Sequence, residues 1–400
     1  MMRIEALTHH GMGRAEDGTL VPRSLPGEKV ELREDGSPRV IEPAPERVAP
    51  PCRHYGACGG CAVQHASDPF VAEWKAGIVR RALQAQGLEA AIAGVETSPP
   101  DSRRRARLAG RRTKKGAIVG FHARASHTLI ETPDCRLLLS SLKAALPALE
   151  AITMLAASRK GEVGLTVTDS PQGPDVAVET DRALTQDLRE ELGRLVQAHG
   201  LSRLTWGTEP VAMEEGPAQR FGTASVVPPP GAFLQATRQG EAALLACVQV
   251  SVGDAARVVD LFAGCGTFTL PLAARAEVHA VEGEAAMLAA LDRGWRGAQG
   301  LKRVSTEARD LFRRPLLPHE LQRYDAAVMD PPRAGAAAQV QALAEARVPV
   351  IAAVSCNPAS FARDAKVLIE AGYAMAPITV VDQFRWSSHV ELATSFRLNG

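Results

Sequence analysis

The chain has 400 residues, with 46 Lys and Arg against 45 Asp and Glu, so its formal net charge is only +1. This length predicts two or three domains, and the near-neutral balance excludes a strongly basic chain, so only a local patch could bind nucleic acid. The N-terminus lacks the apolar core of a signal peptide and no apolar stretch is long enough to cross a bilayer, which predicts a cytoplasmic protein with no membrane partner.

Short apolar runs alternate with turn signals over residues 1–47. The turn signals include Glu16-Asp17-Gly18 and Leu25-Pro26-Gly27-Glu28. This texture predicts a small N-terminal β-barrel or meander. The Pro-rich segment 42–46 then reads as a linker to the next domain.

A cluster of cysteines follows the linker. Cys52, Cys58 and Cys61 are spaced Cys-x5-Cys-x2-Cys, and Cys135 is a fourth candidate farther along the chain. In a reducing compartment such a cluster predicts metal ligands. Four thiolates suit either zinc or an iron–sulfur cluster, and this spacing matches neither a zinc ribbon nor the common ferredoxin runs. The residues alone therefore leave the metal open.

A mixed α+β central domain is predicted over residues 48–230. Its expected elements are a helix over 70–86, hairpin strands within 103–130, a helix over 137–158, strands over 163–167 and 175–178, and a helix over 182–199. A Pro-rich break at 228–231 precedes a further helix over 238–250.

The hairpin carries one concentrated basic stretch, which consists of Arg103, Arg104, Arg105, Arg107, Arg111, Arg112, Lys114 and Lys115. Such a stretch is often no more than a solvated face. Its density in a near-neutral chain favours RNA binding by phosphate neutralisation.

From residue 257 onward short apolar strands alternate with helices. The expected strands cover 258–262, 278–282, 325–330, 348–356, 374–381 and 390–398. This alternation predicts βαβ units and a mostly parallel Rossmann-like sheet, in a third domain over 231–400. Near-continuous apolar strands such as 348–356 are typical of a sheet covered on both faces.

The first of these strands leads into a glycine turn, Asp260-Leu261-Phe262-Ala263-Gly264-Cys265-Gly266, and the second ends at Glu282. A Gly-x-Gly turn lets backbone approach a ligand, and a strand-end acid can accept hydrogen bonds from a ribose, which suits an adenosine-containing cofactor. The third glycine of a dinucleotide fingerprint is missing, and Asp330-Pro331-Pro332-Arg333 closes the 325–330 strand. The combination resembles S-adenosylmethionine-dependent methyltransferases of the Rossmann-like class.

A thiol and a carboxylate are expected at the same edge of this sheet. Cys356 ends an apolar strand at Ser355-Cys356-Asn357-Pro358, and Glu391 begins the last strand. Carbon 5 of a pyrimidine accepts a methyl group once a thiolate has added at C6, and a base must then remove the C5 proton. The competing interpretations are a small buried cysteine and a structural salt bridge.

At these residues the chain resembles the RNA 5-methyluridine methyltransferases, whose signatures Asp-Pro-Pro-Arg, Ser-Cys-Asn-Pro and His-Val-Glu occur here in the family order. The resemblance implies Cys356 as the nucleophile and Glu391 as the general base. It also implies S-adenosylmethionine contacts at Gln235, Phe262, Thr267, Glu282, Asp310 and Asp330. Thr237 stands where the family pattern Phe-x-Gln-x-Asn has Asn, and many members carry Asn where Thr267 stands.

The resemblance extends to the other two parts of the chain. Ribosomal-RNA members of the family carry this cysteine spacing, which implies a [4Fe-4S] cluster on Cys52, Cys58, Cys61 and Cys135, with a structural role. Residues 1–47 resemble a TRAM domain, a small RNA-binding β-barrel. The resemblance thus implies a monomeric enzyme that methylates C5 of a uridine in 23S ribosomal RNA after the base has flipped out.

Three other functions compete with this interpretation. A cytosine-5 RNA methyltransferase usually has another cysteine in the loop that here reads Asp-Pro-Pro-Arg, and an amino-group methyltransferase needs no thiol and typically has an aromatic residue where Arg333 stands. An RNA-binding or assembly factor without catalysis would not need both Cys356 and Glu391.

Overall fold

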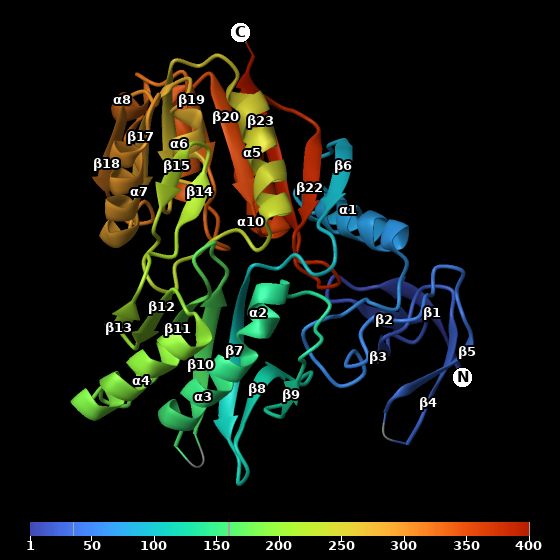
Figure 1. Cartoon of the computed structure of the whole chain (residues 1–400). Helices are drawn as coiled ribbons and strands as arrows, with labels where there is room; N and C mark the ends of the chain where they lie inside the picture. Colours follow the sequence, from blue (N-terminus) through green and yellow to red (C-terminus); the bar gives the residue numbers. More distant parts are fainter. Residues whose placement is uncertain (35, 159–160, 400) are drawn as a thin grey trace.

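The computed structural model describes residues 1–34, 36–158 and 161–399, and it places the chain in three main sheets (Figure 1). The first is a five-stranded antiparallel sheet in the order β3-β2-β1-β4-β5. Its strands are β1 (Met2–Leu7), β2 (Met12–Ala15), β3 (Leu20–Pro22), β4 (Lys29–Leu32) and β5 (Pro38–Glu42). Among the described residues, no pairing joins the edge strands β3 and β5 to close the predicted barrel.

The second sheet forms the centre of the chain and has seven strands in the order β13-β12-β11-β10-β7-β8-β9. They are β7 (Arg105–Arg112), β8 (Ala117–His122), β9 (Leu129–Glu131), β10 (Glu162–Thr168), β11 (Asp175–Glu179), β12 (Arg203–Trp206) and β13 (Glu209–Met213). The helices α2 (Ser140–Ala144), α3 (Leu146–Ala156) and α4 (Gln186–His199) accompany it (Figure 1). Leu149, Ile152 and Leu192 from the helices pack with Leu165 of β10 in one core.

The third sheet has nine strands in the order β18-β17-β16-β19-β20-β23-β22-β6, with β21 paired to β23. They are β6 (Ile92–Thr97), β16 (Arg257–Leu261), β17 (Glu277–Glu282), β18 (Val304–Ala308), β19 (Ala326–Met329), β20 (Val350–Ser355), β21 (Tyr373–Met375), β22 (Ile378–Asp382) and β23 (Glu391–Leu398). The first five strands in this order run parallel, and β23 runs antiparallel to its neighbours.

Helices cover this nine-stranded sheet and complete an open α/β domain, so the predicted Rossmann-like fold class is confirmed (Figure 1). They are α1 (Asp68–Gln84), α5 (Arg238–Val252), α6 (Thr269–Leu272), α7 (Ala285–Gly297), α8 (Pro318–Leu321), α9 (Ala337–Ala346) and α10 (Pro358–Glu370). A separate hairpin, β14 (Gln219–Phe221) and β15 (Ala224–Val226), lies against α7.

The structure differs from the predicted division at residue 230. Strand β6 pairs in parallel with β22, and α1 packs against α10, so residues 68–97 belong to the nine-stranded sheet although they were expected in the central domain. Phe221 and Val226 of the hairpin likewise enter the core shared by α5 and α7. The range 48–230 thus contributes to two cores, because a strand joins whichever sheet has an edge to pair with.

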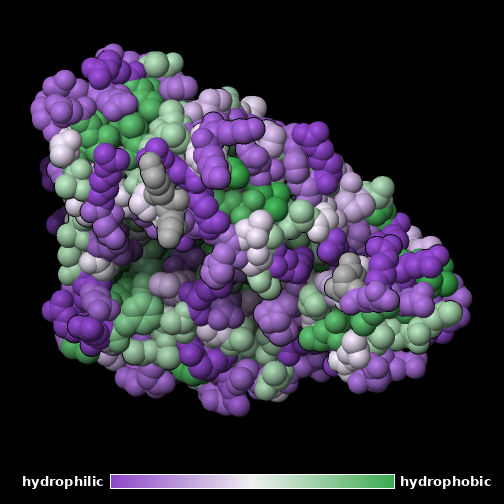
Figure 2. Space-filling model, turned by 90° about the horizontal axis from the view of Figure 1, so that it is seen from below, coloured by the Kyte–Doolittle hydropathy of each residue, from purple (hydrophilic) through white to green (hydrophobic). Residues whose placement is uncertain are grey.

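In the described residues, none of the helices has the length and apolarity needed to cross a membrane. Seen from below, hydrophilic side chains cover most of the surface, with apolar patches between them (Figure 2). This mixture is usual for protein surfaces.

Candidate active site

The carboxyl ends of β16, β17, β19 and β20 meet at one edge of the nine-stranded sheet, where ligands bind in open α/β folds. The antiparallel strand β23 starts at this same edge. Ser355 of β20 pairs with Leu392 of β23, so the next residues outward on the two strands are Cys356 and Glu391. The register therefore brings the predicted nucleophile and the predicted base together.

The Glu391 carboxylate is only 2% exposed. Burial, reinforced by the negative charge of Asp330, raises the pKa of Glu391 to about 8. A hydrogen bond from the Gln383 amide to Glu391 acts in the opposite direction and lowers this pKa. The carboxyl group therefore titrates close to neutral pH, as suits a general base.

Gln383 was not predicted from the sequence, although it connects much of the site. Besides Glu391, its amide nitrogen donates to Gln235 Oε1 at 2.5 Å, and its carbonyl oxygen accepts from the Thr237 backbone N–H at 3.3 Å. Gln383 immediately follows β22, which ends at the same edge as β20. That position after a strand was the available signal, but its use required the order of β22 and β23 in the sheet.

Cys356 is half-buried in the turn between β20 and α10. Burial, with the nearby charges of Glu391 and Asp330, raises the pKa of the Cys356 thiol to about 11, while Arg333 lowers it. The turn is fixed by Asn357, whose side-chain amide donates to the Arg333 carbonyl at 2.8 Å and whose side-chain oxygen accepts from the Ala359 N–H at 3.1 Å. The Ser-Cys-Asn-Pro turn and the Asp-Pro-Pro-Arg loop are thus joined.

The residues implied for the cofactor lie on neighbouring strand ends. Glu282 accepts hydrogen bonds from the Gly264 and Glu284 backbone N–H groups, both at 3.0 Å, so its carboxylate lies against the glycine turn.

Phe262 has a φ of 64°, a strained left-handed conformation for a non-glycine residue. Its ring lies 5.5 Å from that of the half-exposed Phe312, centroid to centroid. A pair of partly open aromatic rings beside two strand-end acids fits an adenosyl group.

Four other polar residues from the sequence motifs lie near this turn. Asp330 accepts from the Gln235 amide at 3.1 Å, and burial raises the pKa of Asp330 to about 7. Asp310 follows β18 and accepts from the Phe312 N–H at 3.0 Å. The fully buried Asp260 accepts from the Thr269 hydroxyl at 2.5 Å, while its Oδ1 has no hydrogen-bond partner in the described residues. Thr267 lies in the glycine turn, half-buried.

The four predicted metal ligands are brought together. Cys52, Cys58, Cys61 and Cys135 line one small cavity of about 20 Å³. Burial and the other three thiols raise the pKa of Cys61 to about 12. Within the described ranges, however, no three His, Cys, Asp or Glu side chains are placed to hold a single metal ion. The arrangement therefore supports neither a zinc ion nor an iron–sulfur cluster, and the metal ligands stay a prediction.

The cysteine loop contacts the segment that precedes Glu391. The Ala62 and Val63 backbone N–H groups both donate to the Trp386 carbonyl, at 2.7 and 3.1 Å. Trp386 itself is held in a left-handed conformation, with a φ of 60°. The loop that carries Cys61 thus anchors a strained residue close to the predicted base.

The basic stretch 103–115 is divided: Arg104 is buried, whereas Arg107, Lys114 and Lys115 are exposed, and its expected role in RNA binding stays a prediction. Arg104 pairs with the Glu241 carboxylate, Arg107 with Glu179, and Arg111 with Glu162. Arg105 donates to the Gly231 carbonyl at 2.9 Å, and Arg103 lies over the Phe384 ring at 5.7 Å. These acidic partners are distant in sequence, so a count of nearby charges did not reveal them. Lys114 and Lys115 at the hairpin tip are exposed.

Comparison with known proteins adds three findings. The profile of the tRNA (uracil-5-)-methyltransferase family matches residues 230–397. The chain is 43% identical to an uncharacterized RNA methyltransferase of Mesorhizobium japonicum, over 95% of this chain and 93% of the relative. It is 35% identical to the 23S rRNA (uracil(1939)-C(5))-methyltransferase RlmD of Halomonas elongata, over 97% of this chain and 87% of the relative.

One solved structure has the same fold over nearly the whole length. It is the tRNA (uracil-54, C5)-methyltransferase of Pyrococcus abyssi in complex with S-adenosyl-L-homocysteine, with a TM-score of 0.76. The alignment covers 99% of this chain and 98% of that chain, at 21% identity.

Proposed function

The chain belongs to the tRNA (uracil-5-)-methyltransferase family of RNA methyltransferases, and on that premise we propose that it methylates C5 of a uridine in 23S ribosomal RNA through Cys356 and Glu391. S-adenosylmethionine-dependent methylation of uracil C5 in RNA is the activity of the family. The β20–β23 register supports the two residue roles, because Cys356 and Glu391 are the next residues after the paired Ser355 and Leu392 on these neighbouring strands.

The side chains divide the reaction between them. The Cys356 thiolate adds to C6 of the uracil ring, which makes C5 nucleophilic enough to accept a methyl group. When bound, S-adenosylmethionine supplies that methyl group. Glu391 then removes the proton from C5, so that the Cys356 sulfur leaves and the aromatic ring is restored. Gln383 holds the Glu391 carboxylate, and Arg333 favours the thiolate form of Cys356.

We expect substitutions of the two residues to stop the reaction at different steps. Cys356→Ala abolishes both methyl transfer and adduct formation. Glu391→Gln lowers turnover by roughly 10² to 10⁴-fold, as for loss of a general base, and lets a covalent protein–RNA adduct accumulate. The measurement is incubation with labelled cofactor and unmodified ribosomal RNA, followed by denaturing gel electrophoresis. Cys247→Ala, a half-buried cysteine on α5, is the matched control. Equal product formation by all three variants would refute these roles.

The choice of 23S ribosomal RNA is supported by the Halomonas relative and by the cysteine spacing. Mapping of 5-methyluridine by mass spectrometry, in cells with and without the gene, tests it. We expect a single uridine of 23S RNA to lose its methyl group when the gene is deleted. Loss of the methyl group from a transfer RNA instead would assign the enzyme to the other substrate class.

We propose further that Cys52, Cys58, Cys61 and Cys135 hold a [4Fe-4S] cluster, and that the N-terminal sheet is a TRAM domain that contacts RNA. Four thiols line one cavity, a ligand set that both zinc and a [4Fe-4S] cluster use, and the choice of the cluster rests on the cysteine spacing of the ribosomal-RNA members of the family. The cluster would tie the loop 52–61 to the central sheet through Cys135.

Anaerobic purification tests this assignment. We expect about four iron and four sulfide per chain, and loss of both in Cys135→Ser but not in Cys247→Ser. Stoichiometric zinc, or iron that Cys135→Ser retains, would contradict it.

A further inference from the structure

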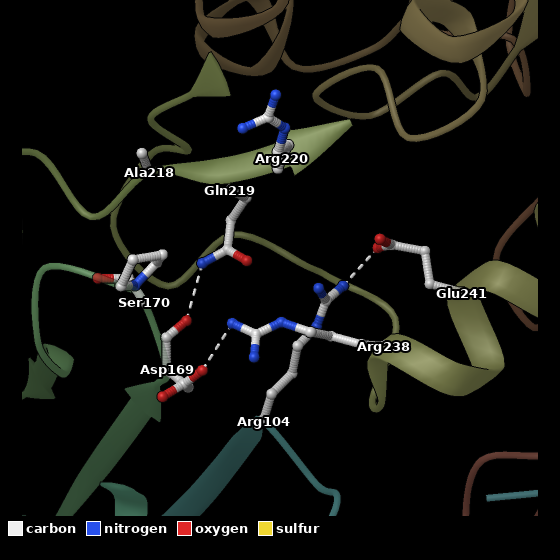
Figure 3. Close-up of a pocket in the computed structure, with 9 residues that line it drawn as sticks. Arg104, Asp169, Ser170, Ala218, Gln219, Arg220, Arg238 and Glu241 are labelled. Carbon is white, nitrogen blue, oxygen red and sulfur yellow. Dashed lines mark hydrogen bonds and ion pairs between the residues drawn. The ribbon is translucent and has the colours of Figure 1, made fainter. Parts of the chain in front are cut away.

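A second cavity, of about 530 Å³, lies apart from Cys356 and Glu391, between the central sheet and the methyltransferase domain (Figure 3). Three arginines line it, Arg104, Arg220 and Arg238, together with the carboxylates Asp169 and Glu241. Its volume falls within the range of small-ligand sites. The mechanism proposed above uses none of these side chains.

The walls of this arginine cavity are held by hydrogen bonds between elements distant in sequence. The Gln219 amide of β14 donates to the Asp169 carbonyl at 2.8 Å, just beyond the end of β10. The Ala218 N–H donates to Gln172 Oε1 at 3.0 Å. The hollow is therefore built into the fold and does not depend on the conformation of a single loop.

The charges around the cavity leave a positive surplus. Arg238 pairs with Asp169 at 2.8 Å, and Arg104 pairs with Glu241, so each carboxylate is already neutralised. Arg220 is exposed and has no carboxylate partner within the described part of the chain. Figure 3 shows its guanidinium group directed away from both ion pairs. The N-terminus of α5, which begins at Arg238, adds further positive potential.

The cavity adjoins the catalytic edge through one short segment. Arg104 donates from Nε to the Gln235 carbonyl at 3.0 Å and from its backbone N–H to the Ala236 carbonyl at 2.9 Å. The Gln235 side chain reaches in the other direction, to Asp330. Arg104 thus connects the wall of the cavity to Gln235, which belongs to the hydrogen-bond network of the active site.

We propose that the arginine cavity binds a phosphodiester group of the RNA strand next to the target uridine, with Arg220 as its principal ligand and Arg238 as a second donor. This inference rests on the proposed function, since it assumes an RNA substrate. Guanidinium groups match phosphate oxygens with paired, charge-assisted hydrogen bonds. Arg238 can share its five N–H donors between Asp169 and a phosphate.

Equilibrium binding of unmodified 23S RNA, transcribed in vitro, tests the proposal over a range of salt concentrations. We expect Arg220→Ala to raise the Kd about tenfold, as for loss of a charged hydrogen bond, and to make the slope of log K against log salt shallower by about 0.7 to 0.9. Arg220→Lys should recover part of the affinity. At saturating RNA the rate of methyl transfer should stay at the wild-type value, and so should cofactor binding.

The matched control is Arg194→Ala, which removes an exposed arginine of α4 that does not line the cavity. If Arg220→Ala and Arg194→Ala change the Kd and the salt slope equally, the effect is one of net charge and the inference is overturned. An unchanged Kd in both Arg220→Ala and Arg220→Gln overturns it as well. These failures differ from failure of the proposed function, in which the wild-type protein itself transfers no methyl group to RNA.

Discussion

Three carboxyl groups at the catalytic edge have pKa values raised towards neutrality by burial: Glu391 to about 8, and Asp330 and Asp260 to about 7. The pKa of the Cys356 thiol is raised mainly by its own burial and further by the negative charges of Glu391 and Asp330, which disfavour the thiolate. The proposed nucleophile and base would repel each other as anions, which suits a reaction that uses them in sequence, first the thiolate and then the carboxylate.

The pKa of Glu391 makes the rate of methyl transfer depend on pH. A carboxylic acid whose pKa is raised to about 8 is mostly protonated at pH 6 and mostly ionised at pH 9. Only the ionised form accepts the C5 proton, and only the thiolate of Cys356, whose pKa is raised to about 11, adds to C6. We therefore expect kcat/KM to rise with pH over the whole range, more steeply below pH 8 than above it. A rate that stays flat between pH 6 and pH 9 would show that proton removal by Glu391 does not limit the reaction.

Gln383 provides a sharper test of the same carboxylate. Its amide donates to Glu391 and lowers that pKa, so Gln383→Leu should move the pH profile to higher pH, with a loss of activity at pH 7 that partly recovers at pH 9. Gln341→Leu is a suitable control, because Gln341 also donates to a glutamate, Glu345, but on the exposed face of α9. A profile for Gln383→Leu that matches the wild type would remove Gln383 from the mechanism.

At the scale of elements, parts of the N-terminal half fix the loop between β22 and β23. Lys75 of α1 is fully buried, pairs with Asp382, and donates to the Phe384 and His389 carbonyls at 3.2 and 2.9 Å. The Trp386 carbonyl accepts from the cysteine loop. Helix α1 thus holds both ends of the segment that leads into Glu391, and the cysteine loop holds its middle.

Removal of Lys75 should therefore cost both stability and activity. Lys75→Met leaves Asp382 as a buried, unpaired charge, which typically destabilises by about 3–5 kcal/mol. Lys29→Met breaks the exposed pair with Glu42 and should cost at most about 1 kcal/mol. Chemical denaturation measures both. The double variant Lys75→Met, Asp382→Asn should recover part of the loss, and if it does not, packing of the lysine stem matters more than the charge pair.

Sequence patterns predicted the buried strands of the nine-stranded sheet best. Strands β16, β19 and β20 are almost wholly buried and read as apolar runs. Strands β18 and β6 were missed because they lie at the two edges, where half of the side chains remain in solvent. The single strand expected over 374–381 is divided into β21 and β22, with Pro377 between them.

The residues of the candidate site also fall into two groups, those that the sequence predicts and those that it does not. Its strand-end residues, such as Glu282 and Cys356, could be predicted because parallel strands bring their carboxyl ends to one edge. Gln383 and the internal ion pair of Arg104 could not, because they depend on contacts between residues more than a hundred positions apart.

At the scale of the whole molecule, the chain passes back and forth between the methyltransferase sheet and the two other main sheets. Residues 68–97 leave the N-terminal part to complete the methyltransferase sheet, and the chain then returns to build the central sheet (Figure 1). Arg104 and Arg105 tie the start of β7 to Glu241 and Gly231 in the methyltransferase part. The central sheet and the methyltransferase sheet are therefore parts of one connected structure.

This connection predicts that residues 231–400 do not fold stably alone, although the sequence pattern marks them as a domain. Without α1 the core loses Val79 and Leu83, both fully buried, at about 1.5–3 kcal/mol each. Without β6 the edge of β22 is unpaired and open to aggregation. We expect the 231–400 fragment to be insoluble or to unfold without a cooperative transition, and co-expression of residues 1–230 as a separate chain to restore a soluble complex. A fragment that unfolds cooperatively, as stable as the full chain, would instead establish residue 231 as a true domain boundary.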